Sequence, residues 1–124
     1  MGISSHPLVL ALRFLLELLS LYAFGRLGFQ LGAGALRFAW AIGLPVLAAL
    51  AWGTFAVPGD PSRSGQAPVP IPGALRLALE LSFFGSACWA LFASGARHAG
   101  WALAGGVLLL HLLSFDRLAW LLRR

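Results

Sequence analysis

The chain contains 124 residues, of which 60% are hydrophobic and only 10% are charged, and its mean hydropathy is +0.86. Ordinary soluble domains carry about 25% charged residues, and a soluble protein of this size buries only about two-thirds of its surface. The composition therefore excludes a soluble enzyme, a free nucleic-acid-binding protein and a disordered chain. It predicts an integral protein of a lipid bilayer, in which the net charge of +5 does not require a nucleic-acid partner.

In chain order, four apolar stretches have the length of about 20 residues that a membrane-spanning helix needs. They cover residues 8–30, 35–57, 74–94 and 99–122. A loop rich in proline, at residues 58–73, separates the second stretch from the third. Because the apolar runs are continuous rather than alternating, strands are not expected. The sequence predicts an all-α fold, with residues 1–124 forming one transmembrane domain built as a four-helix bundle.

The distribution of arginine predicts the orientation of this bundle. Four spans place both termini and the 58–73 loop on one side of the membrane. The arginines predicted on that side are Arg13, Arg63, Arg76, Arg117, Arg123 and Arg124. Those predicted on the opposite side are Arg26, Arg37 and Arg97. Since positive charge accumulates on the cytoplasmic side of membrane proteins, we expect both termini to be cytoplasmic.

An internal repeat links the first and third spans. The heptapeptide that begins at Leu12, Leu-Arg-Phe-Leu-Leu-Glu-Leu, recurs at Leu75 as Leu-Arg-Leu-Ala-Leu-Glu-Leu. Both copies lie near the start of a span, so they run in the same direction and lie at similar depth. This pattern predicts two parallel helical hairpins related by an axis along the membrane normal.

Charged residues are predicted to gather near the cytoplasmic end of the bundle. In each copy of the repeat the arginine precedes the glutamate by four residues, so both project from one helix face. An Asp-Arg pair near the end of the last span returns to the same side. Trp52 lies at about the same depth, where an arginine can stack on its ring. The predicted charge cluster consists of Arg13, Glu17, Arg76, Glu80, Asp116 and Arg117.

Two interpretations of this cluster are open. A charge inside a bilayer costs about 2.5–3.5 kcal/mol on insertion scales, so each side chain is expected to find a partner within the bundle. In the structural interpretation, the charges neutralise one another in pairs and hold the helices together. In the functional interpretation, Glu17 and Glu80 are proton or cation sites, or the arginines bind an anion. The balance of three positive and three negative charges favours the structural interpretation.

His111, near the middle of the fourth span, is a candidate cofactor ligand or proton relay. The alternative is a neutral imidazole that is hydrogen-bonded to a neighbouring helix. No second histidine lies at matching depth, so no cofactor is predicted. Three separated histidines and one cysteine have no ligand spacing, so no metal site is predicted either. The serines lack a histidine at a recognisable spacing, which favours a protein that is not an enzyme.

Four segments carry a further pattern: Leu10-Ala-Leu-Arg-Phe-Leu-Leu-Glu-Leu18, Gly43-Leu-Pro45, Trp52-Gly-Thr-Phe-Ala-Val-Pro58 and Leu75-Arg-Leu-Ala-Leu-Glu-Leu81. Together they resemble the YrdB family, small bacterial four-helix membrane proteins of unknown function, over nearly the whole chain. The Trp-Gly-x-Phe-x-x-Pro element is the most specific part of the resemblance. The family tends to have Asn-Arg where this chain has Asp116-Arg117. The resemblance implies the fold and a location in the bacterial cytoplasmic (inner) membrane, and it implies no activity.

Three classes of function follow as hypotheses. The first is a non-catalytic structural or accessory membrane protein, either a homo-oligomer or a subunit of a larger membrane complex. The second is a small oligomeric transporter or channel that uses Glu17 and Glu80 as ion, proton or solute sites. The third is a cofactor-binding membrane subunit that uses His111.

Overall fold

The computed structural model describes residues 6–59 and 68–123. Its elements are α1 (Pro7–Leu31), α2 (Leu36–Thr54), β1 (Phe55–Ala56), β2 (Val69–Pro70), α3 (Gly73–Ala93), α4 (Arg97–Leu113) and α5 (Phe115–Leu122). The predicted all-helical class is confirmed, apart from the two-residue strands. Three helices, α1, α2 and α3, are long and apolar enough to cross a membrane, and α4 with α5 makes a fourth candidate if the bent pair is one span.

Local signals in the sequence set the ends of α1. His6 caps the helix, because its Nδ1 accepts a hydrogen bond from the backbone N–H of Leu8 at 3.1 Å. Pro7 occupies the first helical position, where its missing N–H leaves no helical hydrogen bond unmade. At the other end Gly32 leaves the helix and Gly34 turns the chain with a φ of +57°. The helix therefore matches the predicted span to within one residue at each end.

The second helix ends earlier than predicted. It stops at Thr54 rather than at residue 57, because Phe55 and Ala56 pair in parallel with Val69 and Pro70. The backbone N–H of Ile71 adds a hydrogen bond of 2.9 Å to the carbonyl of Ala56. The pairing closes the predicted 58–73 loop at its base. Residues 60–67 of that loop, including Arg63, and the terminal Arg124 lie outside the described residues.

The predicted span at 99–122 is not one straight helix, because the chain bends by 71° between α4 and α5. Ser114 separates the two helices and is buried. The short α5 packs against α3, where the backbone of Leu121 lies directly over Gly73. This position also brings Arg117 to Glu80. The bend therefore allows a buried ion pair and a close backbone contact that a straight helix would not make. A hydropathy pattern does not indicate either contact.

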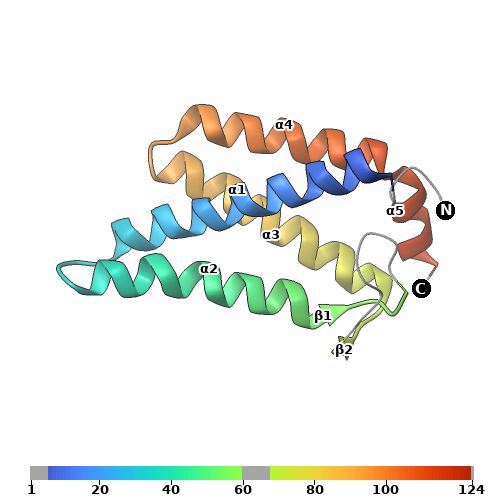
Figure 1. Cartoon of the computed structure of the whole chain (residues 1–124), viewed down its shortest axis with the longest axis horizontal. Coiled ribbons are helices and arrows are strands. Elements are labelled where there is room, and N and C mark those ends of the chain that lie inside the picture. Colours follow the sequence, from blue (N-terminus) through green and yellow to red (C-terminus); the bar gives the residue numbers. More distant parts are fainter. Residues whose placement is uncertain (1–5, 60–67, 124) are drawn as a thin grey trace.

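The first helix has a central position among the long helices. It contacts α2, α3 and α4, and Figure 1 shows that α1 and α3 run in the same direction, with α2 and α4 reversed. The shared core contains small residues, such as Ala23, Ala87 and Ala90, alongside Leu91 and Leu103. Figure 1 also places the start of α1 and the short α5 at the same end of the molecule. The predicted charge cluster lies at this end.

Candidate functional site

Three arginines from three helices converge on the carboxylate of Glu80, and we call these four residues the Glu80 cluster. Arg117 from α5 binds both carboxylate oxygens, with Nη1 donating to Oε2 at 2.9 Å and Nη2 to Oε1 at 2.6 Å. Arg13 from α1 donates to Oε1 at 3.3 Å. Arg76 lies one turn before Glu80 on α3, and its Nε donates to Oε1 at 3.4 Å. A two-pronged guanidinium contact is the strongest of these geometries.

The Glu80 cluster is closed to the surroundings. Glu80, Arg76 and Arg117 have no exposed surface, and Arg13 is 4% exposed. Removing such groups from water costs several kcal/mol for each ion, so they remain charged in the interior only where partners compensate them closely. The four residues thus hold the ends of α1, α3 and α5 in one arrangement. Within the described residues, the carboxylate of Glu80 has no exposed surface and is contacted by all three arginines.

Arg76 also connects the cluster to the end of α2. Its Nη1 donates to the carbonyl of Trp52 at 2.7 Å and to that of Phe55 at 2.6 Å. The last carbonyls of a helix have no helical donor, so a guanidinium placed there both satisfies them and complements the helix dipole. The guanidinium carbon also lies 4.3 Å from the centre of the Trp52 ring. Arg76 is therefore the arginine that stacks on Trp52.

The two other predicted carboxylates have surroundings unlike those of Glu80. Glu17 is half-buried, and its Oε1 accepts a hydrogen bond of 2.9 Å from the indole N–H of Trp52. Asp116 is half-buried in the first turn of α5, where a negative charge is favourable to the helix dipole. Arg13, Arg76 and Arg117 all meet at the carboxylate of Glu80. The two glutamates of the repeat occupy equivalent positions, and the indole N–H of Trp52 donates to Glu17.

His111 lies apart from this arrangement. Its Nδ1 is 2.8 Å from the carbonyl of Val107 in its own helix, and a carbonyl can only accept, so Nδ1 carries the proton. Its ring also meets Phe84 edge-on, with 6.4 Å between the ring centres. The partner is thus within α4 rather than on the neighbouring helix that the sequence suggested. Among the described residues, no three His, Cys, Asp or Glu side chains are grouped as a metal site requires.

The comparisons with known proteins agree with the resemblance seen in the sequence. A family model described as "Protein of unknown function (DUF2568)" matches residues 11–122. The chain is 34% identical over 115 residues to "Uncharacterized protein YrdB" of Bacillus subtilis (strain 168), which covers 93% of this chain and 94% of that protein. The chain belongs to the YrdB family. No solved structure matches it.

This member of the YrdB family has a second polar cluster, which the sequence reasoning missed, in the other half of α1. Arg26 donates from Nε to the hydroxyl of Ser94 at 3.1 Å and from Nη2 to the Ser94 carbonyl at 2.8 Å. Gln30 donates to the same carbonyl at 2.9 Å, and the hydroxyl of Tyr22 accepts from Arg26 at 3.1 Å. The signal was present, because residues 22, 26 and 30 recur every four positions and so share one helix face.

Proposed function

We propose that this YrdB-family protein is a non-catalytic integral protein of the bacterial cytoplasmic membrane, in which the Glu80 cluster is a structural lock. The observation that carries the proposal is the complete enclosure of Glu80 by three arginines from three helices. A binding site for a transported ion needs a route to its ligands. Here the route is filled by guanidinium groups that also support the ends of the helices.

The lock accounts for a four-helix bundle made of two parallel hairpins. Arg13 and Arg76 are the equivalent arginines of the repeat, and both turn to Glu80. Arg76 connects the end of α2 to the cluster through the Trp52 carbonyl, and Arg117 connects α5, the segment that follows α4, through its ion pair with Glu80. Each of the four long helices is thus joined to the cluster, directly or through its adjoining segment. The parallel course of α1 and α3 in Figure 1 supports the same proposal.

The exposed surface of α2 supports assembly with other chains. Among the residues of α2, all of which the structure describes, only Trp52 is buried. Large side chains cover its outer surface, including Phe38, Trp40, Ile42 and Leu47. Contiguous apolar surface of this kind is covered by lipid or by a protein partner. We propose that α2 faces the lipid bilayer and a second copy or a larger membrane complex.

The transport alternative rests on Glu17, which is half-buried and accepts a hydrogen bond from the indole N–H of Trp52. Liposomes that contain the purified protein and a pH-sensitive dye are expected to lose an imposed pH gradient no faster than empty liposomes. Proton flux in the wild type that disappears in Glu17→Gln would instead establish the transporter. Light scattering on the same preparation counts the chains in the assembly, and a monomer would leave only the accessory-subunit form of the proposal.

We also propose that both termini lie in the cytoplasm. A green fluorescent protein fused after the last residue is expected to fluoresce in cells, whereas alkaline phosphatase fused at the same position is expected to be inactive. The phosphatase needs disulfides, which form only on the oxidising side of the membrane. Matched fusions within the turn at residues 32–35 should give the opposite pair of results. Active phosphatase at the C-terminus would reverse the proposed orientation.

A further inference from the structure

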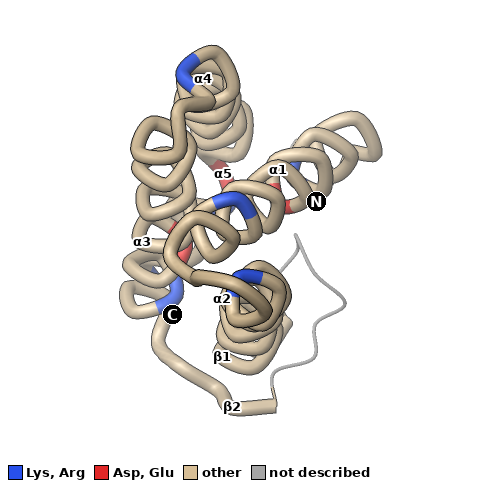
Figure 2. Tube along the Cα trace, turned by 90° about the vertical axis from the view of Figure 1, so that its left-hand side faces the viewer, with Lys and Arg blue, Asp and Glu red and all other residues tan. Residues whose placement is uncertain are grey.

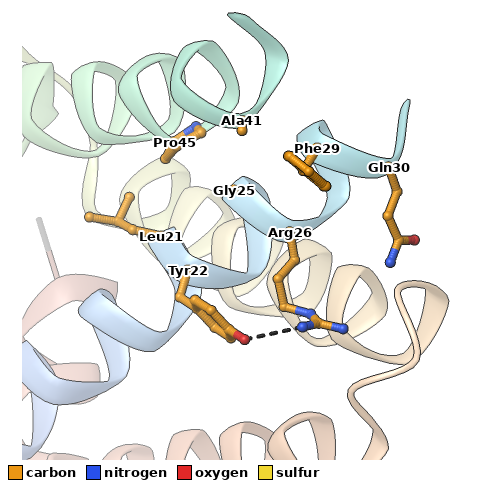
Figure 3. Close-up of a pocket in the computed structure, with 8 residues that line it drawn as sticks. All are labelled: Leu21, Tyr22, Gly25, Arg26, Phe29, Gln30, Ala41 and Pro45. Carbon is orange, nitrogen blue, oxygen red and sulfur yellow. Dashed lines mark hydrogen bonds between the residues drawn. The ribbon is translucent and has the colours of Figure 1, made fainter. Parts of the chain in front are cut away.

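A pocket between α1 and α2 combines an apolar groove with a polar edge. Its volume is about 620 Å³, within the range of about 300–1,000 Å³ typical of small-molecule sites. Figure 3 shows Tyr22 and Arg26 on one side of it and Pro45 across the gap. The remaining lining residues are Leu21, Gly25, Phe29, Gln30 and Ala41. Such a pocket fits a molecule with a hydrocarbon portion and a charged group.

The charge on Arg26 has no acidic counterpart in the described structure. Its hydrogen-bond partners are the hydroxyl and carbonyl of Ser94 and the hydroxyl of Tyr22, all of which are neutral. The acidic residues of the chain are Glu17, Asp60, Glu80 and Asp116, so none follows Glu17 in α1 and none occurs in α2. Glu17 lies nine residues before Arg26, which is about 14 Å along a helix. An anion is therefore the missing partner of this site.

A second cation, Arg37, lies against one of the residues that line the pocket. The guanidinium carbon of Arg37 is 4.7 Å from the centre of the Phe29 ring, and Phe29 lines the pocket. The Nε of Arg37 is buried and has no hydrogen-bond partner within the described residues. Figure 2, viewed from this end of the molecule, shows basic segments on α1, α2 and α4. A second positive charge thus lies beside the pocket, next to its lining residue Phe29.

The position along the helix identifies the class of ligand. Arg26 lies five residues before the end of α1, which is about 8 Å by helix rise and corresponds to headgroup depth in a bilayer. From there the groove continues past Leu21 and Pro45 toward the middle of the helices. Long basic side chains at such positions reach toward the membrane interface. A phosphate at Arg26 would accordingly direct an attached acyl chain along the groove.

We propose that this pocket binds an anionic phospholipid, with its phosphate held by Arg26 near the positive charge of Arg37 and one acyl chain in the groove between α1 and α2. Two uncompensated cations favour a headgroup of net negative charge over a zwitterionic one, whose ammonium group they would repel. The proposal requires insertion into a bilayer. It is independent of the role of the Glu80 cluster, so either can fail without the other.

Native mass spectrometry tests the site on protein purified in mixed micelles that contain phosphatidylglycerol and phosphatidylcholine in equal amounts. The wild type is expected to retain phosphatidylglycerol preferentially. Arg26→Gln is expected to reduce that retention about tenfold, since a charge-assisted hydrogen bond is worth at least as much as that factor. Arg97→Gln is the matched control, because Arg97 is exposed at the same end but does not line the pocket.

Because Arg26 also holds Ser94, a second variant separates binding from folding. Ala41→Leu fills the groove and leaves both arginines unchanged, and it is expected to reduce retention by a similar factor. Equal retention in the wild type, Arg26→Gln and Ala41→Leu would overturn the proposal. Loss in Arg26→Gln but not in Ala41→Leu would overturn the acyl-chain groove and indicate an anion site, as would displacement of the lipid by inorganic phosphate.

Discussion

Glu80→Gln is expected to abolish the stable fold. The substitution preserves the shape of the side chain but leaves Arg13, Arg76 and Arg117 buried around a neutral amide. Breaking one buried ion pair costs about 3–5 kcal/mol, because the remaining charge stays desolvated. Three arginines share this carboxylate, and a small domain has a total stability of only about 5–15 kcal/mol. Yield after membrane extraction and the thermal unfolding midpoint in one fixed detergent measure the effect.

Glu17→Gln is the matched control for this experiment, because it makes the same chemical change at the equivalent position of the repeat. Glu17 is half-buried and accepts from the indole N–H of Trp52, and a glutamine oxygen can accept the same hydrogen bond. We expect Glu17→Gln to lower the midpoint much less than Glu80→Gln does. A Glu80→Gln protein that unfolds at the wild-type temperature would contradict the structural role proposed for the cluster.

The second large effect is expected for Gly73→Ala at the start of α3. A methyl group there would overlap the backbone carbonyl of Leu121, and backbone cannot move aside as a side-chain tip does. Overpacking a well-packed contact costs about 1–3 kcal/mol. The displacement would also move α5, which carries Arg117, away from Glu80. We therefore expect Gly73→Ala to lower the thermal unfolding midpoint by more than the overpacking alone would. The midpoint is measured in the same detergent.

Gly85→Ala supplies the comparison within the same helix. The space beside Gly85 is open, with nothing within 4 Å of the position of an added methyl group. Alanine is a better helix former than glycine by about 1 kcal/mol, so this variant should be neutral or slightly stabilised. If Gly73→Ala behaved like Gly85→Ala, the close contact between α3 and α5 would not exist in the membrane-bound protein.

The helices could largely be predicted from the sequence, because their ends are marked locally. Pro7 and Gly32 delimit α1, and Gly95, with a φ of +88°, turns the chain between α3 and α4. The bend at Ser114 could not be predicted in this way. Residues 99–122 are equally apolar whether straight or bent, and the bend is favoured by contacts with Gly73 and Glu80, which lie more than 30 residues away in the sequence.

Of the predicted charge cluster, the structure brings Arg13, Arg76 and Arg117 together at Glu80, and spacing and depth did not reveal this pairing. The repeat makes Glu17 and Glu80 look alike, whereas the structure places Arg117 of α5 on both carboxylate oxygens of Glu80. The arginine count used to predict the orientation is also affected. Three of the arginines that it assigned to the cytoplasmic side are buried in the Glu80 cluster rather than placed in loops. The groove between α1 and α2 could not be predicted either, because it depends on how the two helices pack. The periodicity of one helix contains no information about that packing.

The bend between α4 and α5 has a consequence for bilayer thickness. As a helix of 17 residues, α4 rises about 25 Å, whereas the hydrocarbon core of a typical bilayer is about 30 Å thick. By contrast, α1 has 25 residues and rises about 37 Å. Unequal helices side by side require the lipid to thin beside the shorter one or the longer one to tilt. In a bilayer, the protein would therefore either thin the lipid along the flank that carries α4 or tilt so that α1 fits the thickness of the core.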